Sequence, residues 1–255
     1  MTFLNVDVAA GVATVVIDRP PANAVDPALI DEFLTVVPAL TGDPSVRVIV
    51  LTGVGRFFIA GADIAVMRDL SLANHVRMRR WIEVQRLLEL APKPVIAALN
   101  GHTLGGGAEL SLACDLRLAA ESATIGFPEM QLGLFPGAGG SQRLPRLLGL
   151  HRAKLLMIEG RRLPAAEALS LGLVDEVLPD AGFAEAVAAR AAAWAAKPTA
   201  TIGLLKNSML KGAPLDMEGA MAVEWEAVQQ VIAGEDAAEG LQSFLDKRKP
   251  VFRGK

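Results

Sequence analysis

Short apolar runs alternate with helical patterns through the first half of this chain, and that alternation limits the folds open to it. Residues 3–8 and 12–18 flank Gly11 and predict a β-hairpin. Residues 46–51, apolar except for Arg47, and the apolar run Val95–Leu99 are typical of strands buried on both faces. Because helical patterns lie between these runs, the sequence predicts an α/β fold.

The helices show recognisable starts and breaks. Asp26 followed by Pro27 combines a capping side chain with proline at the first helical position, and so predicts a helix start. Residues 72–90 predict a second long helix. Strand signals stop after about residue 180, and the remainder predicts helices broken at Lys197-Pro198, residues 212–214 and Gly234.

The length and composition exclude several classes of protein. At 255 residues the chain suits one domain, or one domain with a small helical extension. The net charge of −3, without basic blocks, argues against nucleic acid as a partner. The single cysteine, Cys114, and only three histidines disfavour disulfides and metal sites, so no metal is expected. With no membrane segment or secretion signal in the pattern, a cytoplasmic protein is expected.

Three consecutive glycines, residues 105–107, follow the strand Val95–Leu99 and lead into an apolar helix. The first backbone N–H groups of such a helix are unpaired and favour negative charge. One interpretation is therefore a site that stabilises an enolate or oxyanion. The alternative is that the glycines only permit a tight turn and close packing.

Two isolated carboxylates lie near glycine-rich stretches. Glu109 falls one turn into the apolar helix after the glycine triplet, and Glu129 lies between Pro128 and a second glycine-rich stretch that ends at Gly140. If the two converge in different environments, one supplies a proton and the other acts as a base. Spacing alone leaves open that each merely faces solvent.

A third stretch, residues 57–64, joins the strand at residues 46–51 to a short predicted helix. Its small residues permit a ligand to approach the backbone. An ordinary strand-to-helix connection, with Asp63 near the helix start, explains it equally well.

Together these stretches resemble the enoyl-CoA hydratase/isomerase family, also called the crotonase superfamily. The resemblance covers nearly the whole chain and is carried by Arg19-Pro20, Asn23-Ala24 and residues 58–64, 104–115, 128–142 and 244–250. It implies a crotonase-type spiral of ββα units over residues 1–195. It also implies a helical C-terminal portion, residues 196–255, that builds trimers and commonly hexamers made of two trimers.

The resemblance also implies roles for individual residues. Ala62 and Gly106 match the two backbone donors that hold the thioester oxygen. Glu109 matches the base toward water, Glu129 matches the proton donor, and Gly137 matches a backbone group that helps to hold the water. The implied reaction is hydration of a 2-enoyl-CoA.

Contacts with the acyl-CoA follow in the same way. The expected substrate-binding residues are Asn23, Ala24, Ala60, Ala62, Asp63, Ile64, Met67, Phe135, Phe244 and Lys247, the last two reaching a neighbouring subunit's coenzyme. Packing of Phe244 and solvation of Lys247 explain these two residues equally well. Met67, Met78 and Trp81 fit either an acyl pocket or helix packing.

Other functions stay open at this point. One is another crotonase reaction, such as double-bond isomerisation or hydration of a branched or polar enoyl-CoA. Another is an acyl-CoA-binding protein without catalysis. A nicotinamide site is disfavoured because Gly53-Val54-Gly55 lacks the third glycine of that fingerprint. No cofactor is expected, since coenzyme A belongs to the substrate.

Overall fold

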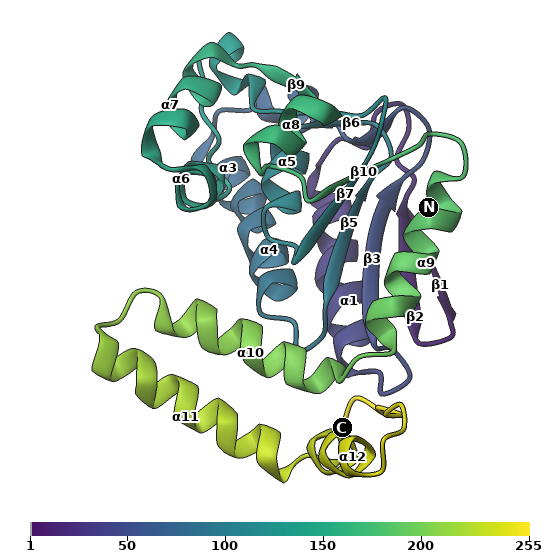
Figure 1. The fold of residues 1–255 in the computed structure, drawn as a ribbon. Coiled ribbons are helices and arrows are strands. Elements are labelled where there is room, and N and C mark those ends of the chain that lie inside the picture. The colour runs from purple at the N-terminus through teal and green to yellow at the C-terminus, as the bar shows by residue number, and fades with distance from the viewer. Residues whose placement is uncertain (1) are drawn as a thin grey trace.

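In the middle of the chain, successive strands alternate between two β-sheets (Figure 1). The structure is a computed structural model and describes residues 2–255. The strands are β1 (Leu4–Ala9), β2 (Val12–Ile17), β3 (Val48–Gly53), β4 (Phe57–Ile59), β5 (Val95–Leu99), β6 (His102–Leu104), β7 (Leu116–Ala120), β8 (Thr124–Gly126), β9 (Arg162–Pro164) and β10 (Glu176–Leu178). The helices are α1 (Pro27–Gly42), α2 (Ile64–Met67), α3 (Leu72–Arg79), α4 (Trp81–Glu89), α5 (Gly106–Ser111), the 3₁₀ helix η1 (Pro128–Leu132), α6 (Gly140–Leu148), α7 (Leu150–Glu159), α8 (Ala165–Leu171), α9 (Phe183–Ala195), α10 (Thr199–Gly212), α11 (Met217–Ala233) and α12 (Glu235–Leu245).

The strand order explains the repeat. The larger sheet has the order β1-β2-β3-β5-β7-β10 and the smaller one β4-β6-β8-β9. The pairs β3–β4, β5–β6 and β7–β8 each place one strand in each sheet, and a helical segment follows each pair. Pairing is parallel except at the β1–β2 hairpin and at β8–β9. The predicted α/β fold of ββα units is confirmed.

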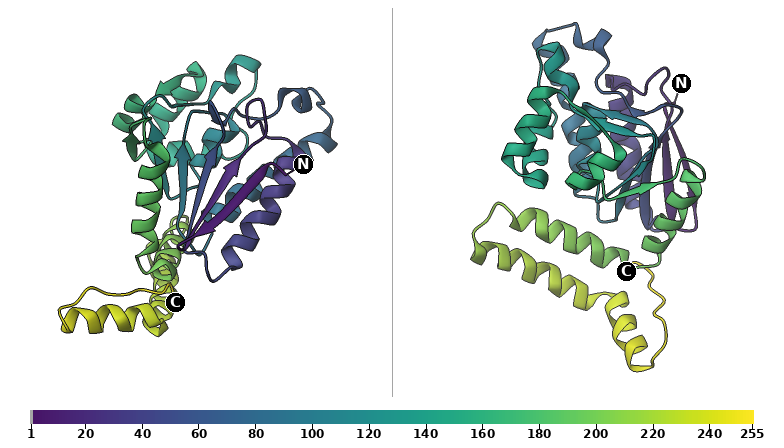
Figure 2. Two further views of the ribbon diagram at one scale, coloured as in Figure 1. Left: turned by 90° about the vertical axis from the view of Figure 1, so that its right-hand side faces the viewer. Right: turned by 45° about the horizontal axis from the view of Figure 1, so that its top comes forward.

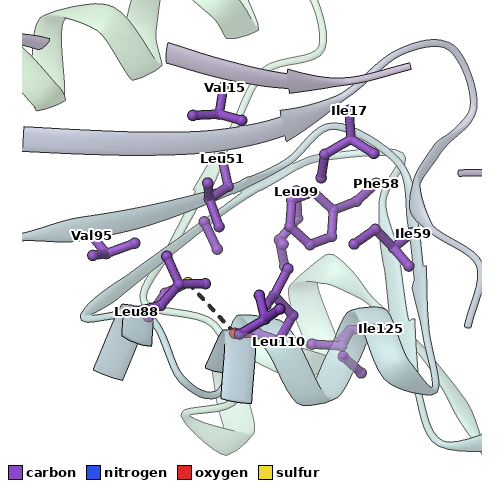
Figure 3. Close-up of a cluster of buried hydrophobic side chains, with 14 of the residues drawn as sticks. Val15, Ile17, Leu51, Phe58, Ile59, Leu88, Val95, Leu99, Leu110 and Ile125 are labelled. Atoms are coloured by element: carbon purple, nitrogen blue, oxygen red, sulfur yellow. Dashed lines mark hydrogen bonds between the residues drawn. The ribbon is translucent and has the colours of Figure 1, made fainter. Parts of the chain in front are cut away.

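Buried side chains fill both faces of the larger sheet. On one face they pack with α1, α4 and α5, and Figure 3 shows Ile17, Leu51, Phe58 and Leu99 meeting there. On the other face α9 covers β3, β5 and β7. All five residues of β5 and of β7 are buried, which explains the continuous apolar run of β5. The one charged residue of β7, Arg117, pairs with Asp175.

The local helix signals were partly right. Asp26 caps α1 by accepting a hydrogen bond from the Leu29 amide at 2.9 Å, and Pro27 is the first helical residue, as predicted. The single helix predicted over residues 72–90 is wrong, because the chain breaks at Arg80 into α3 and α4. The thiol of Cys114 is buried, and burial raises its pKa to about 12.

The helices beyond residue 195 extend away from the sheets (Figures 1 and 2). They are separated at the predicted breaks before α10, before α11 and at Gly234. Helix α11 buries none of its residues, and Met217, Met221, Trp225 and Ile232 expose more than half of their surface on it. Within residues 2–255 no helix is both long and apolar enough to cross a membrane.

Candidate active site

Three strand-to-helix connections meet at Gly105, the residue that caps α5. Gly105 has a φ of 52°, a conformation that favours glycine. A Cβ added to it would lie 3.0 Å from Glu129 Oε1 and 3.5 Å from the Gly61 Cα atom. The parallel register of β6 and β8, with Leu104 opposite Gly126, brings the α5 and η1 connections together. The site is therefore built from residues that lie far apart in the sequence.

The carboxyl group of Glu109 is buried and held by backbone amides. Glu109 projects from α5 and is 3% exposed. The amides of Ala138 and Gly140 both donate to its Oε1 atom at 2.8 Å. Burial raises the pKa of Glu109, while these two hydrogen bonds and the nearby Arg143 charge oppose that rise.

Glu129 has a different environment. It is the second residue of η1 and is partly buried. Its Oε2 atom is inaccessible to solvent and has no hydrogen-bond partner among residues 2–255. Burial, and then repulsion from the Glu109 charge, raise the pKa of Glu129 to about 7.

The charge of Glu109 thus affects the pKa of Glu129, and the two carboxyl groups differ in their hydrogen bonds. Glu109 has two amide donors that stabilise its ionised form, whereas Oε2 of Glu129 has none. Hydrogen bonds to the charged form favour that form, so the two amides favour ionised Glu109, whereas burial without a donor favours protonated Glu129. This arrangement suits a reaction that removes one proton and delivers another.

Two backbone amides near the carboxylates are free to bind an oxyanion. Ala62 pairs with Val25 through its neighbours: Gly61 O accepts from the Val25 amide, and the Asp63 amide donates to Val25 O. The Ala62 amide therefore points away from Val25. Gly106 is the first residue of α5, and a Cβ on Gly61 would lie 3.9 Å from its nitrogen. Within residues 2–255 neither amide donates to a backbone carbonyl.

A partly buried arginine fixes the connection that carries Ala62. Arg19 Nη2 lies 2.8 Å from Asp26 Oδ2 and 2.9 Å from Asp63 Oδ2. Asp63 also caps α2 by accepting from the Ala65 amide. Although partial burial works against it, Arg19 and the backbone donors hold the pKa of Asp63 below its usual value. The alternative interpretation of this stretch, with Asp63 at a helix start, is confirmed, and a substrate contact of Asp63 stays a prediction.

Asn23 has a structural role that its motif did not reveal. Its side chain is 3% exposed, and Nδ2 donates to Phe57 O at 2.9 Å. Its Oδ1 atom accepts from the Arg19 amide. The side chain thus ties the β2–α1 connection to β4.

The remaining predicted binding residues divide into two groups. Ala24, Ala60, Ile64 and Met67 lie along the connections around Ala62, and Phe135 and Gly137 are exposed in the loop before α6. Phe244, in α12, and Lys247, which follows it, are exposed on the side of the molecule away from α5 (Figures 1 and 2). A single chain therefore does not bring these last two residues to the glutamates.

Two neighbours of the site have contacts that the sequence did not predict. Trp81, which fitted either an acyl pocket or helix packing, is buried against Phe33 and donates from its indole nitrogen to Gly106 O at 3.0 Å. Arg143 lies under the loop that holds Glu109 and pairs with Glu89 at 3.0 Å. Trp81 and Arg143 lie 25 and 54 residues from Gly106 and Glu89, respectively, so no local sequence pattern predicts these two contacts. Among residues 2–255 no group of three or more histidines, cysteines or acids is placed to hold a metal ion.

Comparisons with known proteins by family model, by sequence and by structure agree with one another. The model of the family described as Enoyl-CoA hydratase/isomerase matches residues 7–255. A crotonyl-CoA hydratase of Syntrophomonas wolfei is 40% identical over 247 residues, 95% of each chain. A short-chain-enoyl-CoA hydratase of Clostridium acetobutylicum is 37% identical, covering 93% of this chain and 92% of the relative. The crystal structure of an enoyl-CoA hydratase from Bacillus anthracis superposes over the full length of both chains, with a TM-score of 0.94 and 38% identity.

Proposed function

Because the chain belongs to the enoyl-CoA hydratase/isomerase family, we propose that it hydrates 2-trans-enoyl-CoA thioesters to 3-hydroxyacyl-CoA. The observation that carries this proposal is the pair of glutamates with unequal surroundings. Glu109 accepts two amide hydrogen bonds on one oxygen, and a buried oxygen of Glu129 has no donor in the described part of the chain. Addition of water needs one group of each kind.

In the proposed reaction the thioester oxygen lies between the amides of Ala62 and Gly106. As water attacks C3 of the enoyl group, negative charge moves through C2 to that oxygen. Two fixed donors stabilise this enolate more than they stabilise the neutral thioester, and each donor contributes roughly 3–4 kcal/mol. The short α5 helix adds the positive end of its dipole at Gly106.

The two glutamates carry out the proton transfers. Glu109 accepts a proton from water as the water oxygen bonds to C3, while the amide of Gly137 helps to hold that water. Protonated Glu129 then gives its proton to C2, and the enolate collapses to the thioester. One proton has been gained by Glu109 and one lost by Glu129, so exchange between the two or with solvent restores the starting state.

The substrate class is an acyl-CoA. The proposed contacts are the backbone groups of Ala24 and Ala60, the region from Ala62 to Met67, and Phe135. Phe244 and Lys247 would contact a coenzyme bound by a neighbouring subunit, which fits their distance from α5 within one chain. The exposed apolar residues of α11 support a homotrimer or a homohexamer.

The proposed chemistry requires no redox cofactor and no metal, because the enolate charge is stabilised by backbone amides. The proposed setting is cytoplasmic acyl-CoA metabolism of the β-oxidation type, supported by hydratases of bacteria among the relatives.

Isomerisation of a 3-enoyl-CoA is the second candidate, because it uses the same enolate and the family name includes it. An isomerase moves a proton between two carbons of the acyl group and adds no water. The free oxygen of Glu129, near Glu109, is compatible with such a transfer. Purified protein should therefore be assayed with both crotonyl-CoA and a 3-enoyl-CoA.

The deciding assay follows the loss of conjugated enoyl-thioester absorbance from crotonyl-CoA. Glu109→Gln and Glu129→Gln are each expected to lower the rate by at least about 100-fold while acyl-CoA binding survives. Glu121→Gln, at an exposed glutamate, serves as the matched control and should leave the rate unchanged. Absence of hydration with crotonyl-CoA and longer 2-enoyl-CoAs would overturn the proposal, and retained binding would then favour a non-catalytic acyl-CoA-binding protein.

A further inference from the structure

Arg143 lies directly beneath the turn that holds Glu109. It belongs to the first turn of α6, and its side chain folds back under Gly139, where an added Cβ would clash with Nη1. Gly139 has a φ of 108°, which leaves the flanking amides of Ala138 and Gly140 free to donate to Glu109 Oε1. The guanidinium and the carboxylate therefore lie on either side of one tight turn.

The guanidinium is held in this place from a second helix. Its Nε donates to Glu89 Oε1 at 3.0 Å, and Nη2 donates to Glu89 Oε2 at 3.2 Å. Nη1 donates to Gln85 Oε1 at 2.7 Å, and Gln85 is fully buried. The side chains of Arg143 and Glu89 are each only 14% exposed. A planar, bidentate pair of this kind fixes the guanidinium in one orientation.

We propose that Arg143 is a positioning residue for Glu109: its guanidinium supports the turn of residues 138–140, whose amides hold one oxygen of Glu109 and leave the other for the reacting water. This inference rests on the proposed function, in which Glu109 is the base. Helix α4 then contributes to the active site indirectly, because its residues Glu89 and Gln85 hold the side chain of Arg143.

The charges around Glu109 support the same role. Arg143 faces it from α6, and Glu129 faces it from η1. Strand β4 carries no charged residue, and the only ionisable residue of β6, His102, bonds to Thr124. Arg143 is therefore the cation that favours ionised Glu109, and Glu89 behind it partly offsets that charge.

The first experiment measures kcat/KM for enoyl-CoA hydration against pH in three variants. Arg143→Met removes both the charge and the support, and should lower kcat about 10- to 100-fold and move the acidic limb of the profile up by roughly half a pH unit or more. Arg143→Lys keeps the charge but not the bidentate geometry, so kcat should fall while the acidic limb stays in place. Arg146→Met, at an exposed arginine of the same helix, is the matched control and should behave as wild type.

A second experiment reads Glu109 without relying on activity. Infrared spectra of the carboxylic-acid band, recorded against pH and corrected by subtracting Glu109→Gln, give the midpoint of Glu109 ionisation. Arg143→Met should raise this midpoint. Glu89→Gln, which leaves Arg143 without its countercharge, should lower it, and the opposite signs distinguish an electrostatic role from general loosening.

The variants also distinguish the positioning role of Arg143 from the proposed hydratase function. If Arg143→Met does not fold, the double variant R143M/E89Q removes the buried pair without leaving a lone charge, and its midpoint is compared with that of Glu89→Gln. An unshifted midpoint and an unshifted acidic limb would overturn the inference, even if activity or the melting temperature falls. A wild type that does not hydrate enoyl-CoA but shows the infrared shifts would overturn the proposed function alone.

Discussion

The Gly140 amide donates to Glu109 Oε1 at 2.8 Å, and the same glycine leaves no room for a side chain. A Cβ at this position would lie 2.9 Å from both Oε1 and Cγ of Glu109. Gly140 has no positive φ, so alanine suits its backbone and the substitution acts on Glu109. Gly140→Ala should lower kcat for hydration about 10-fold or more, because a displaced base loses alignment with water.

A matched substitution separates this effect from helix propensity. Gly42, at the end of α1, has no atom within 4 Å of an added Cβ. Gly42→Ala should leave kcat unchanged and raise the melting temperature slightly, as expected for alanine in a helix. Equal kcat values for Gly140→Ala and Gly42→Ala would contradict the role assigned to the Gly140 contact.

The pH dependence of the rate follows from Glu129. Burial and the Glu109 charge raise the pKa of Glu129 to about 7, and the proposed mechanism requires its protonated form. The protonated fraction falls as pH rises, so kcat/KM should decline by up to about tenfold per pH unit once the pH exceeds this value. Initial rates from about pH 5 to pH 9 test this expectation, and a rate that keeps increasing to pH 9 would contradict it.

Glu129 should also make stability depend on pH. The pKa of Glu129 is about 7 in the folded protein and about 4.3 in the unfolded chain. Below about pH 4.3 the group is protonated in both states and its pKa shift does not affect stability. As the pH rises to about 7, the unfolded chain loses this proton first, so the folded state is progressively destabilised. Glu129→Gln should therefore gain about 2 kcal/mol relative to wild type between pH 5 and pH 8. Urea unfolding at both pH values measures this difference, and the exposed Glu121→Gln should show none.

Trp81 offers a test of how Gly106 is held. Its indole nitrogen donates to Gly106 O at 3.0 Å, and its ring meets the edge of Phe33 with centroids 5.4 Å apart. Trp81→Phe keeps an aromatic ring but removes the donor, so stability should fall by about 1 kcal/mol and kcat by several-fold. Trp225→Phe, on α11, is the control. Unchanged kcat in Trp81→Phe would show that the indole bond does not position Gly106.

The sequence predicted elements whose causes are local. The start of α1 followed from Asp26 and Pro27, and the buried strand β5 from its unbroken apolar run. The break at Arg80 was missed because helical residues continue across it. Only the burial pattern marks the change, since α3 buries just Asn74 whereas α4 buries four residues.

The candidate site was predicted less completely, because its contacts are long-range. Local sequence identified Glu109 and Glu129 as isolated carboxylates, but the β6–β8 register brings them together. The resemblance supplied their roles. The pairs Arg143–Glu89 and Arg19–Asp63 join residues 54 and 44 positions apart, and each residue by itself looks like an ordinary surface charge.

We expect Lys206 to stabilise the attachment of α10 to the part of the chain that contains the sheets. This residue of α10 is 9% exposed, and its Nζ atom lies 2.6 Å from Asp115 Oδ2, which also accepts from the Val95 amide. Lys206→Met leaves the partly buried Asp115 without this cation, so the protein should lose about 2 kcal/mol of stability, and amide hydrogen exchange in α10 should accelerate. Lys211→Met, at an exposed position of the same helix, should change neither the stability nor the exchange rate.

Adding Asp115→Asn to Lys206→Met should restore part of the lost stability, because an uncharged side chain tolerates burial better. Coincident unfolding curves for Lys206→Met and Lys211→Met would contradict this role and leave the attachment of α10 to apolar packing alone.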